Sequence, residues 1–186
     1  MVVFFVSARG YFEAGISLLH ADHWSKQYAL SLELFELSVV VHLMDGRDDA
    51  VFNRLDDILS NAASFEDSLN SRVLKAKLLA SQAKYDDAID GIVETLAILG
   101  ESFPKEITSS LVMDEINAMT PMLEGLTKEK ISKLPIMTDK VKLKAMNFLD
   151  LLLTLSNSSS PMLMHLVSCR MTKLTFEVRD RLQRRF

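Results

Sequence analysis

Apolar residues recur along most of the chain at spacings of one, three and four residues, which is the period of an amphipathic α-helix. The clearest run has Ala88, Ile89, Ile92, Val93, Leu96 and Leu99 on one face. Acidic residues at its start would meet the positive end of the helix dipole. Gly100 can adopt the left-handed conformation that ends a helix, and Pro104 can open the next helix because that position needs no N–H. The pattern predicts a helix from near Asp86 to Leu99, with Ala88 at the closest helix contact.

The same period predicts helices elsewhere in the chain, and no segment requires a strand. Turn residues and capping residues divide these helices: Ser64 opens one helix, Thr127 opens a short one, and Thr138 with Asp139 caps another. The segment 157–161 reads Asn-Ser-Ser-Ser-Pro and predicts a loop. Pro121 is expected to bend or interrupt its helix. The remaining predicted helices span residues 7–20, 26–44, 48–60, 64–83, 104–126, 127–134, 140–155 and 162–178.

Three of these helices open with similar segments, GYFEAGISLL, GRDDAVFNRL and KYDDAIDGIV. They align with Ala14, Ala50 and Ala88 in one register, 36 and 38 residues apart, and Tyr11 and Tyr85 precede two of the alanines. A helix-turn-helix period in the thirties is typical of tetratricopeptide arrays. An unrelated helical bundle with chance alanine spacing is the alternative. The predicted fold is an all-α solenoid of antiparallel, tetratricopeptide-like helix pairs. Residues 1–103 form the repeats, 104–178 continue as less regular helical pairs, and 179–186 are a basic tail.

Composition narrows the functional classes. The chain has 186 residues, of which 48% are apolar, enough for one domain or a short repeat array. A net charge of −4 argues against a nucleic-acid-binding body, although four arginines lie in the last eight residues. The single cysteine, Cys169, cannot form an internal disulfide, which favours a reducing compartment. No run approaches the ~20 apolar residues of a membrane span. We therefore expect a cytoplasmic protein.

Three stretches carry a family resemblance: LAILGESFP (96–104), ISKLPIMTDKVKLKAMNFLDLLL (131–153) and SPMLMHLVSCRMTKLTFE (160–177). Their order and spacing resemble the helical region of large sensor kinases coupled to AAA-type (STAND-like) ATPases, which include multi-sensor histidine kinases and serine/threonine-kinase hybrids. Trp24 with Tyr28 is similar to an upstream tryptophan of that region. The residues that carry the resemblance in the three stretches are Leu99, Gly100, Pro104, Leu134, Pro135, Met137, Thr138 and Asp139.

The resemblance implies a non-catalytic interaction or regulatory module of a signal-transduction protein. Its partner would be a peptide segment or a neighbouring ATPase or kinase domain, with self-association through open repeat ends as a further option. The sequence contains no Gly-x-x-x-x-Gly-Lys-Ser/Thr phosphate loop and no kinase glycine loop. We therefore expect any ATPase or kinase activity to reside outside this sequence, which resembles a fragment. No cofactor, nucleic acid or metal is expected. An orphan structural fragment without activity is a second interpretation.

The remaining candidate chemistry has a structural alternative at each position. His20 and His23 are three residues apart, as zinc ligands can be, but turn residues between helices fit better. Asp45, Asp48 and Asp49 beside a glycine lack the oxygen spacing of a calcium loop. His42 and His165 are the candidates for a phosphoacceptor in a histidine-kinase-associated segment, and both also fit as core or groove histidines. Cys169 follows His165 by one turn, as an activated thiol would. The methionines could line an adaptable peptide groove or fill gaps in the core.

Overall fold

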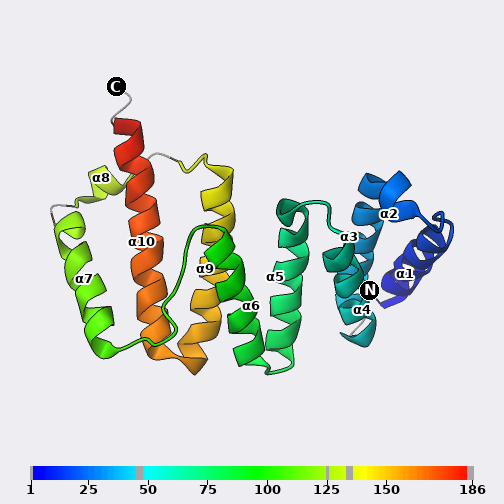
Figure 1. The fold of residues 1–186 in the computed structure, drawn as a ribbon, viewed down its shortest axis with the longest axis horizontal. Coiled ribbons are helices and arrows are strands. Elements are labelled where there is room, and N and C mark those ends of the chain that lie inside the picture. Colours follow the sequence, from blue (N-terminus) through cyan, green and yellow to red (C-terminus); the bar gives the residue numbers. More distant parts are fainter. Residues whose placement is uncertain (1, 45–47, 125, 133–135, 184–186) are drawn as a thin grey trace. The chain divides into compact units, whose positions relative to one another are not determined.

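A computed structural model describes residues 2–44, 48–124, 126–132 and 136–183 (Figure 1). Within these ranges the chain is helical and contains no strand, which confirms the predicted all-α class. The contacts divide it into two compact units, unit 1 from Met1 to Lys84 and unit 2 from Tyr85 to Phe186. This division is based on contacts between residues, whereas the predicted division between residues 103 and 104 is based on a change in the spacing of apolar residues. The two divisions therefore describe different properties of the chain.

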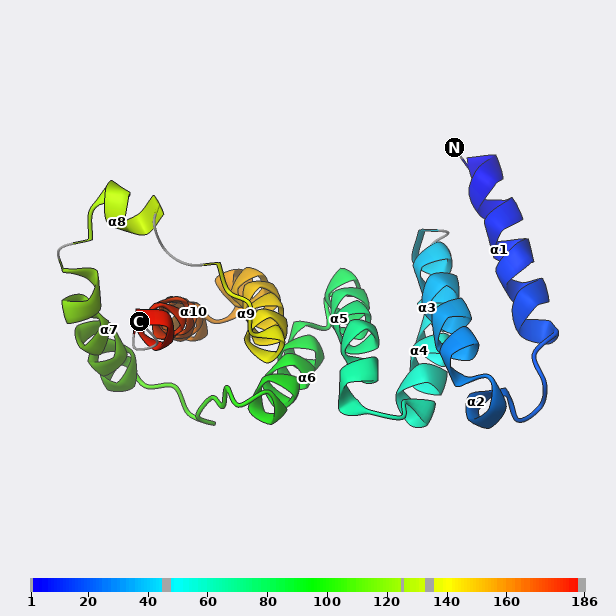
Figure 2. The same cartoon turned by 90° about the horizontal axis from the view of Figure 1, so that it is seen from above.

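Unit 1 packs helices that follow one another along the chain. α3 packs against α1 and α4, α4 packs against α5, and the short α2 packs on α3 (Figures 1 and 2). The buried core consists of Phe35 and Val39 of α3, three residues of α4 and Leu78 of α5. Each helix therefore supplies one apolar stripe to a shared core, as the 3.6-residue period requires. The helices are α1 (Val2–Ser17), α2 (His23–Lys26), α3 (Tyr28–Met44), α4 (Asp48–Asn61) and α5 (Phe65–Ser81).

Unit 2 has a different order of neighbours. α9 and α10 form an antiparallel hairpin, α6 packs against α9, and α7 packs against α10 (Figure 1). The order in space is therefore α6, α9, α10, α7. The core is mostly aliphatic and includes Leu149 and Leu152 of α9 with Leu166 and Leu174 of α10. The helices are α6 (Tyr85–Ile98), α7 (Ser109–Leu123), α8 (Lys128–Ser132), α9 (Lys140–Ser159) and α10 (Pro161–Gln183).

Several predicted helix ends are confirmed in atomic detail. The Ser64 hydroxyl accepts a hydrogen bond from the Asp67 N–H at 3.2 Å and caps α5. The Asp139 carboxylate accepts from the backbone N–H groups of Val141 and Lys142 and caps α9. Gly100 has a φ of +92°, the left-handed conformation expected after α6.

The prediction that Pro104 opens a helix is wrong. Residues 101–108 form a connection, and α7 begins at Ser109. The reason is a better cap: the Thr108 hydroxyl accepts from the Leu111 N–H at 3.3 Å and so satisfies one of the free N–H groups at the helix start. Pro121 does not interrupt α7, which continues through it and ends at Leu123.

The predicted loop at 157–161 is also wrong. α9 continues to Ser159, and Ser160 alone separates it from α10, which begins at Pro161. Serine residues fit into the helix here because their hydroxyls can hydrogen-bond to carbonyls of the preceding turn. The Ser156 hydroxyl donates to Leu153 O, and the Ser159 hydroxyl donates to Leu155 O. Two smaller corrections apply elsewhere. The segment 26–44 is divided into α2 and α3 around Gln27, and α10 extends five residues past the predicted end at residue 178, through most of the predicted tail.

Candidate functional site

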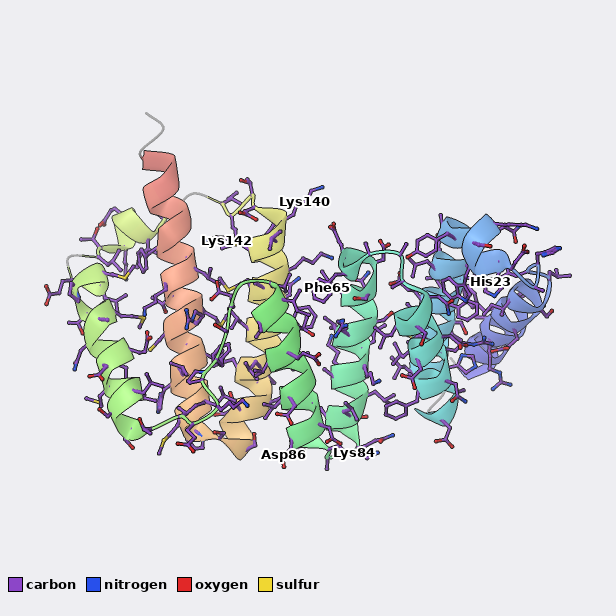
Figure 3. The ribbon with its side chains drawn as sticks, in the orientation of Figure 1. His23, Phe65, Lys84, Asp86, Lys140 and Lys142 are labelled. Carbon is purple, nitrogen blue, oxygen red and sulfur yellow. The ribbon has the colours of Figure 1, made fainter. Side chains whose placement is uncertain are left out.

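Unit 2 contains a cleft of about 400 Å³ where three segments meet. One wall is the turn that follows α6, the second is the first two turns of α9, and the third is the middle of α10. Lys142 lies on the first turn of α9 at this place (Figure 3). The volume lies within the range of ligand-binding clefts in proteins, about 300–1,000 Å³. The lining residues are Leu99, Gly100, Glu101, Asp139, Val141, Lys142, Ala145, Arg170, Lys173 and Leu174.

The first two walls are positioned by helix ends. Gly100 turns the chain sharply, and the Glu101 N–H donates to Leu96 O at 2.8 Å, which satisfies a carbonyl of the last turn of α6. This bond holds Glu101 at the cleft. Asp139 enters the cleft because it is the N-cap of α9, and its Oδ1 accepts from Val141 N at 3.0 Å and Lys142 N at 3.2 Å. The negative carboxylate also lies at the positive end of the helix dipole.

The third wall consists of two cations on α10. The Arg170 Nε lies 3.6 Å from a carboxylate oxygen of Glu101, and its guanidinium carbon lies 5.9 Å from the centre of the Phe103 ring. The Lys173 Nζ forms an ion pair and hydrogen bond with the Glu115 carboxylate of α7. These pairs link α10 to the turn after α6 and to α7. They therefore fix two cationic side chains at the edge of the cleft.

Apolar residues lie beneath and beside the charged walls, although most of the exposed lining of the cleft is polar. Ala145 and Leu174 are buried, and Val141 is 54% exposed at the edge of the cleft. Cys169 is adjacent in sequence to Arg170 but is buried, and burial together with the nearby Glu115 carboxylate raises the pKa of its thiol. A raised pKa leaves the thiol protonated at neutral pH, so Cys169 does not have the thiolate character of a nucleophile. His165, one turn earlier, is exposed and forms no hydrogen bond or ion pair with Cys169.

The cleft brings together all three stretches on which the family resemblance rests. Leu99 and Gly100 come from the first stretch, Asp139 from the second, and Arg170 and Leu174 from the third. Other residues that carry the resemblance lie outside the lining: Pro104 and Thr138 are exposed and Met137 is half-buried. Leu134 and Pro135 lie outside the described residues. Residues far apart in the sequence therefore converge on one place in unit 2.

The predicted residues of unit 1 have packing roles. The Trp24 ring lies 4.9 Å from the Phe35 ring and 6.1 Å from the Tyr28 ring, centre to centre. The Tyr28 hydroxyl donates to Asp67 Oδ2 and accepts from Ala63 N, both at 2.8 Å. These contacts join the start of α3 to the segment that opens α5. Trp24 and Tyr28 therefore stabilise unit 1 at its helix connections.

The three aligned alanines differ in burial. Ala88 of α6 is fully buried, as expected of a close helix contact. Ala50 is half-buried and Ala14 is exposed, and Tyr85 is exposed at the start of α6. The close-packing role inferred for Ala88 is thus seen there and does not extend to Ala14.

One arrangement in unit 1 has the residue types of a nucleophilic triad. The Ser38 hydroxyl lies 3.3 Å from His42 Nδ1, and His42 Nε2 lies 3.2 Å from the Glu13 carboxylate. Ser38 is 0% exposed, so no substrate could reach its oxygen. His42 Nδ1 is also closer to the Ser38 carbonyl oxygen, at 2.7 Å, than to the hydroxyl. A general base must lie within reach of the proton that it removes in a substrate complex. The arrangement therefore links α1 to α3 and is not a catalytic site.

The other candidate positions do not converge. His20 contacts Asp22, whereas His23 Nδ1 lies 2.9 Å from the Ser31 hydroxyl and its ring stacks on Phe35. No group of three or more metal-ligating side chains occurs in the part of the chain that the structure describes. Of the candidate calcium ligands, Asp45 and the side chain of Asp48 lie outside the described residues, and Asp49 is exposed. None of the described helices combines the length and hydropathy that a membrane span requires.

Sequence reasoning missed four charged residues of the cleft: Glu101, Lys142, Arg170 and Lys173. Helical periodicity identifies the polar face of α10, but it does not say which part of that face another segment covers. The sequence did contain a signal for the two cations of α10. Arg170 and Lys173 are three residues apart, and they flank the buried side of a helix that ends in further positively charged residues. Such a pair lies on one helix face.

Comparisons with protein-family models, with curated proteins and with solved structures gave no match.

Proposed function

We propose that the chain is a non-catalytic interaction and regulatory module that binds a segment of a partner protein in the unit 2 cleft. The observation that carries this proposal is the convergence of the three resembling stretches on one cleft, which has charged walls and the exposed apolar side chain of Val141 at its edge. Peptide grooves in helical proteins combine these two features, since apolar contacts supply affinity and polar groups supply specificity. The resemblance makes a segment of a signalling ATPase or kinase the partner that we favour.

The proposal includes a helical-repeat architecture. In unit 1, α3, α4 and α5 pack on one another in sequence order, which is the contact pattern of repeat arrays. We propose that α3, α4 and α5 are tetratricopeptide-like repeats and that unit 2 is a divergent continuation. Binding in unit 2 would then regulate a neighbouring domain by favouring one of its conformations, to the extent that the partner has different affinities for the two.

A site-specific photo-cross-linking experiment tests the proposal. The photoreactive residue p-benzoylphenylalanine replaces Val141 at the cleft edge in the full chain, and the chain is irradiated in the cells that express it. Met113 on α7 provides a matched control because its exposed fraction is also 54% and it does not line the cleft. We expect a discrete cross-linked protein at Val141 only, identified by mass spectrometry. Equal cross-linking at both positions, or none at either, would contradict the proposal.

A further inference from the structure

α3 has apolar residues on two faces, and only one of these faces is buried. The inner face buries Phe35 and Val39 in the core that α3 shares with α4. A helix with apolar residues on opposite faces ordinarily packs on both sides. The outer face is therefore suited to a second packing contact. Its apolar residues are Leu30, Leu37, Val40 and Met44, with exposed fractions of 47%, 43%, 38% and 62%.

The spacing of this outer stripe matches another helix. Together with the exposed Glu33, it occupies positions 30, 33, 37, 40 and 44, so the steps alternate between three and four residues. This alternation is the 3.5-residue repeat that lets two helices stay in contact over several turns. At 1.5 Å per residue the outer stripe is about 21 Å long, which corresponds to a partner helix of about 15 residues.

Glu33 determines the charge that the partner must carry. It is the one charged residue of the outer stripe, and its carboxylate forms no hydrogen bond or ion pair with any residue that the structure describes. A helix packed on the stripe would take this carboxylate out of water, which is costly unless a cation meets it. The partner helix must therefore present Lys or Arg to Glu33 and apolar side chains to the rest of the stripe.

A second copy of the chain does not meet this requirement by pairing α3 with α3. The helix contains no lysine or arginine from Tyr28 to Met44. In a parallel pair the two Glu33 carboxylates would face each other. In an antiparallel pair centred on Leu37, each carboxylate would face the valines near position 41 of the other copy. Both pairings bury the carboxylate without a cation.

A membrane surface does not meet the requirement either. Helices that lie on membranes carry Lys and Arg beside the apolar face, and these cations bind anionic lipids. The outer stripe has a carboxylate instead, which an anionic surface repels.

We infer that the outer stripe of α3 binds an amphipathic helix of a partner protein. The apolar residues of that helix repeat at alternating steps of three and four, and one Lys or Arg of the helix pairs with Glu33. The surface lies within unit 1, so the inference goes beyond the proposed function and does not depend on the unit 2 cleft.

Synthetic helical peptides of about 15 residues test the inference. Each peptide has leucine at the positions that face the stripe, alanine and glutamine elsewhere, capped ends, and one facing position that carries Lys, Gln or Glu. Two series place this position in the first or the last turn, because the helix can run in either direction. Fluorescence anisotropy measures binding to the full chain. We expect the Lys peptide of one series to bind about tenfold more tightly than the Glu peptide, with the Gln peptide between them.

Charge reversal on the chain shows whether Glu33 causes this order. Glu33→Lys should invert it, so that the Glu peptide binds best. Asp57→Lys is the matched control, because Asp57 is exposed on α4, does not belong to the outer stripe, and its reversal changes the net charge by the same amount. The control variant should keep the order of the unchanged chain.

A substitution in the middle of the stripe tests the apolar contact. Leu37→Ser should weaken binding of every peptide roughly tenfold, because buried apolar area is lost. Ile98→Ser is its control, since Ile98 is 57% exposed on α6 in unit 2, and this variant should bind as the unchanged chain does. Circular dichroism melting of each variant establishes that it is folded.

The other outcomes overturn the inference. Equal binding of the Lys and Glu peptides to the unchanged chain, or binding of no peptide, contradicts it directly. A dimer in sedimentation equilibrium that Leu37→Ser dissociates would assign the stripe to a second copy. Binding to phosphatidylserine-containing vesicles that Leu37→Ser abolishes would assign it to a membrane. None of these results bears on the unit 2 cleft, so this inference and the proposed function can fail separately.

Discussion

Unit 1 and unit 2 are both helical, but they differ in which helices become neighbours. In unit 1, α2, α3 and α4 each pack on the next helix along the chain, and α1 packs on α3. In unit 2 the hairpin of α9 and α10 lies between α6 and α7, so the two flanking helices contact partners that come much later in the sequence. Both units also have polar cross-links, through Tyr28 and Glu13 in unit 1 and through Arg170 and Lys173 in unit 2.

The difference explains where a cleft can form. In unit 2 the connection after Gly100 must pass the hairpin before α7 begins at Ser109. That connection, the start of α9 and the middle of α10 line the cleft, and the space between these three segments is not filled. In unit 2 the cleft thus lies where helices that are distant in sequence meet.

The largest expected effects come from the two cores. Leu55→Ala in unit 1 and Leu152→Ala in unit 2 each remove a fully buried side chain and leave a cavity. Each should lower the free energy of unfolding of its unit by about 2–5 kcal/mol. Hydrogen exchange measured amide by amide assigns the loss of protection to a unit.

Substitutions of an exposed leucine and an exposed isoleucine are the controls for the two core substitutions. Leu18→Ala in unit 1 and Ile136→Ala in unit 2 change side chains that are 84% and 86% exposed, so each should alter stability by less than about 0.5 kcal/mol. If the exposed variants cost as much as the buried ones, the assignment of the two cores is wrong.

Tyr28→Phe tests the polar cross-link of unit 1. The change removes one hydrogen bond to the Asp67 carboxylate and one from the Ala63 N–H, and should cost about 1–3 kcal/mol. Urea unfolding measured at pH 7 gives this value. An unchanged midpoint would mean that the Tyr28 hydroxyl makes no net contribution.

Tyr28 should also make the stability of the fold depend on pH, with a decrease at high pH. Burial and, to a smaller extent, the bonded Asp67 raise the pKa of Tyr28 above its ordinary value of 10. The unfolded chain then loses the tyrosine proton first, so the stability from this group is complete below pH 10 and decreases as the pH rises through the raised pKa. Tyr28→Phe should show a smaller decrease between pH 9 and pH 11, because the substituted residue does not titrate. Equal pH profiles would contradict the assignment.

Arg54→Met should have a smaller effect. Arg54 donates to the Glu13 carboxylate at 2.8 Å and lies over the Phe35 ring at 4.9 Å. Methionine keeps an apolar cover on the ring but removes the ion pair. Because Glu13 is 43% exposed, solvent screens the pair, and we expect a loss of about 1 kcal/mol by urea unfolding. A loss as large as that of Leu55→Ala would mean that the ion pair determines the position of α1.

The rate at which Cys169 is alkylated tests the packing of unit 2 without any substitution. Its thiol is buried and its pKa is raised, so alkylation by iodoacetamide at pH 8 should be far slower than for the same chain in 6 M urea. Mass spectrometry measures both rates. Similar rates in the two solutions would show that the α10 core is open.

Local features of the fold could be predicted from the sequence, and long-range features could not. The caps at Ser64 and Asp139 and the turn at Gly100 depend on neighbouring residues, and all three are present. The segment 157–160 looked like a loop because Asn and Ser are common in loops, yet α9 continues to Ser159, whose hydroxyl donates to Leu155 O. The pairing of α6 with α9 depends on side chains some fifty residues apart, which periodicity does not record. Arg170 could not be placed at the cleft for the same reason.

The packing of Trp24 on Phe35 and Tyr28 gives the unlabelled chain an optical probe. Trp24 is the single tryptophan of the sequence, and it lies in unit 1. Its fluorescence emission therefore follows the environment of unit 1 alone, whereas far-ultraviolet circular dichroism follows the helices of both units. A stopped-flow unfolding experiment that records both signals would separate the kinetics of the two units without any engineered chromophore.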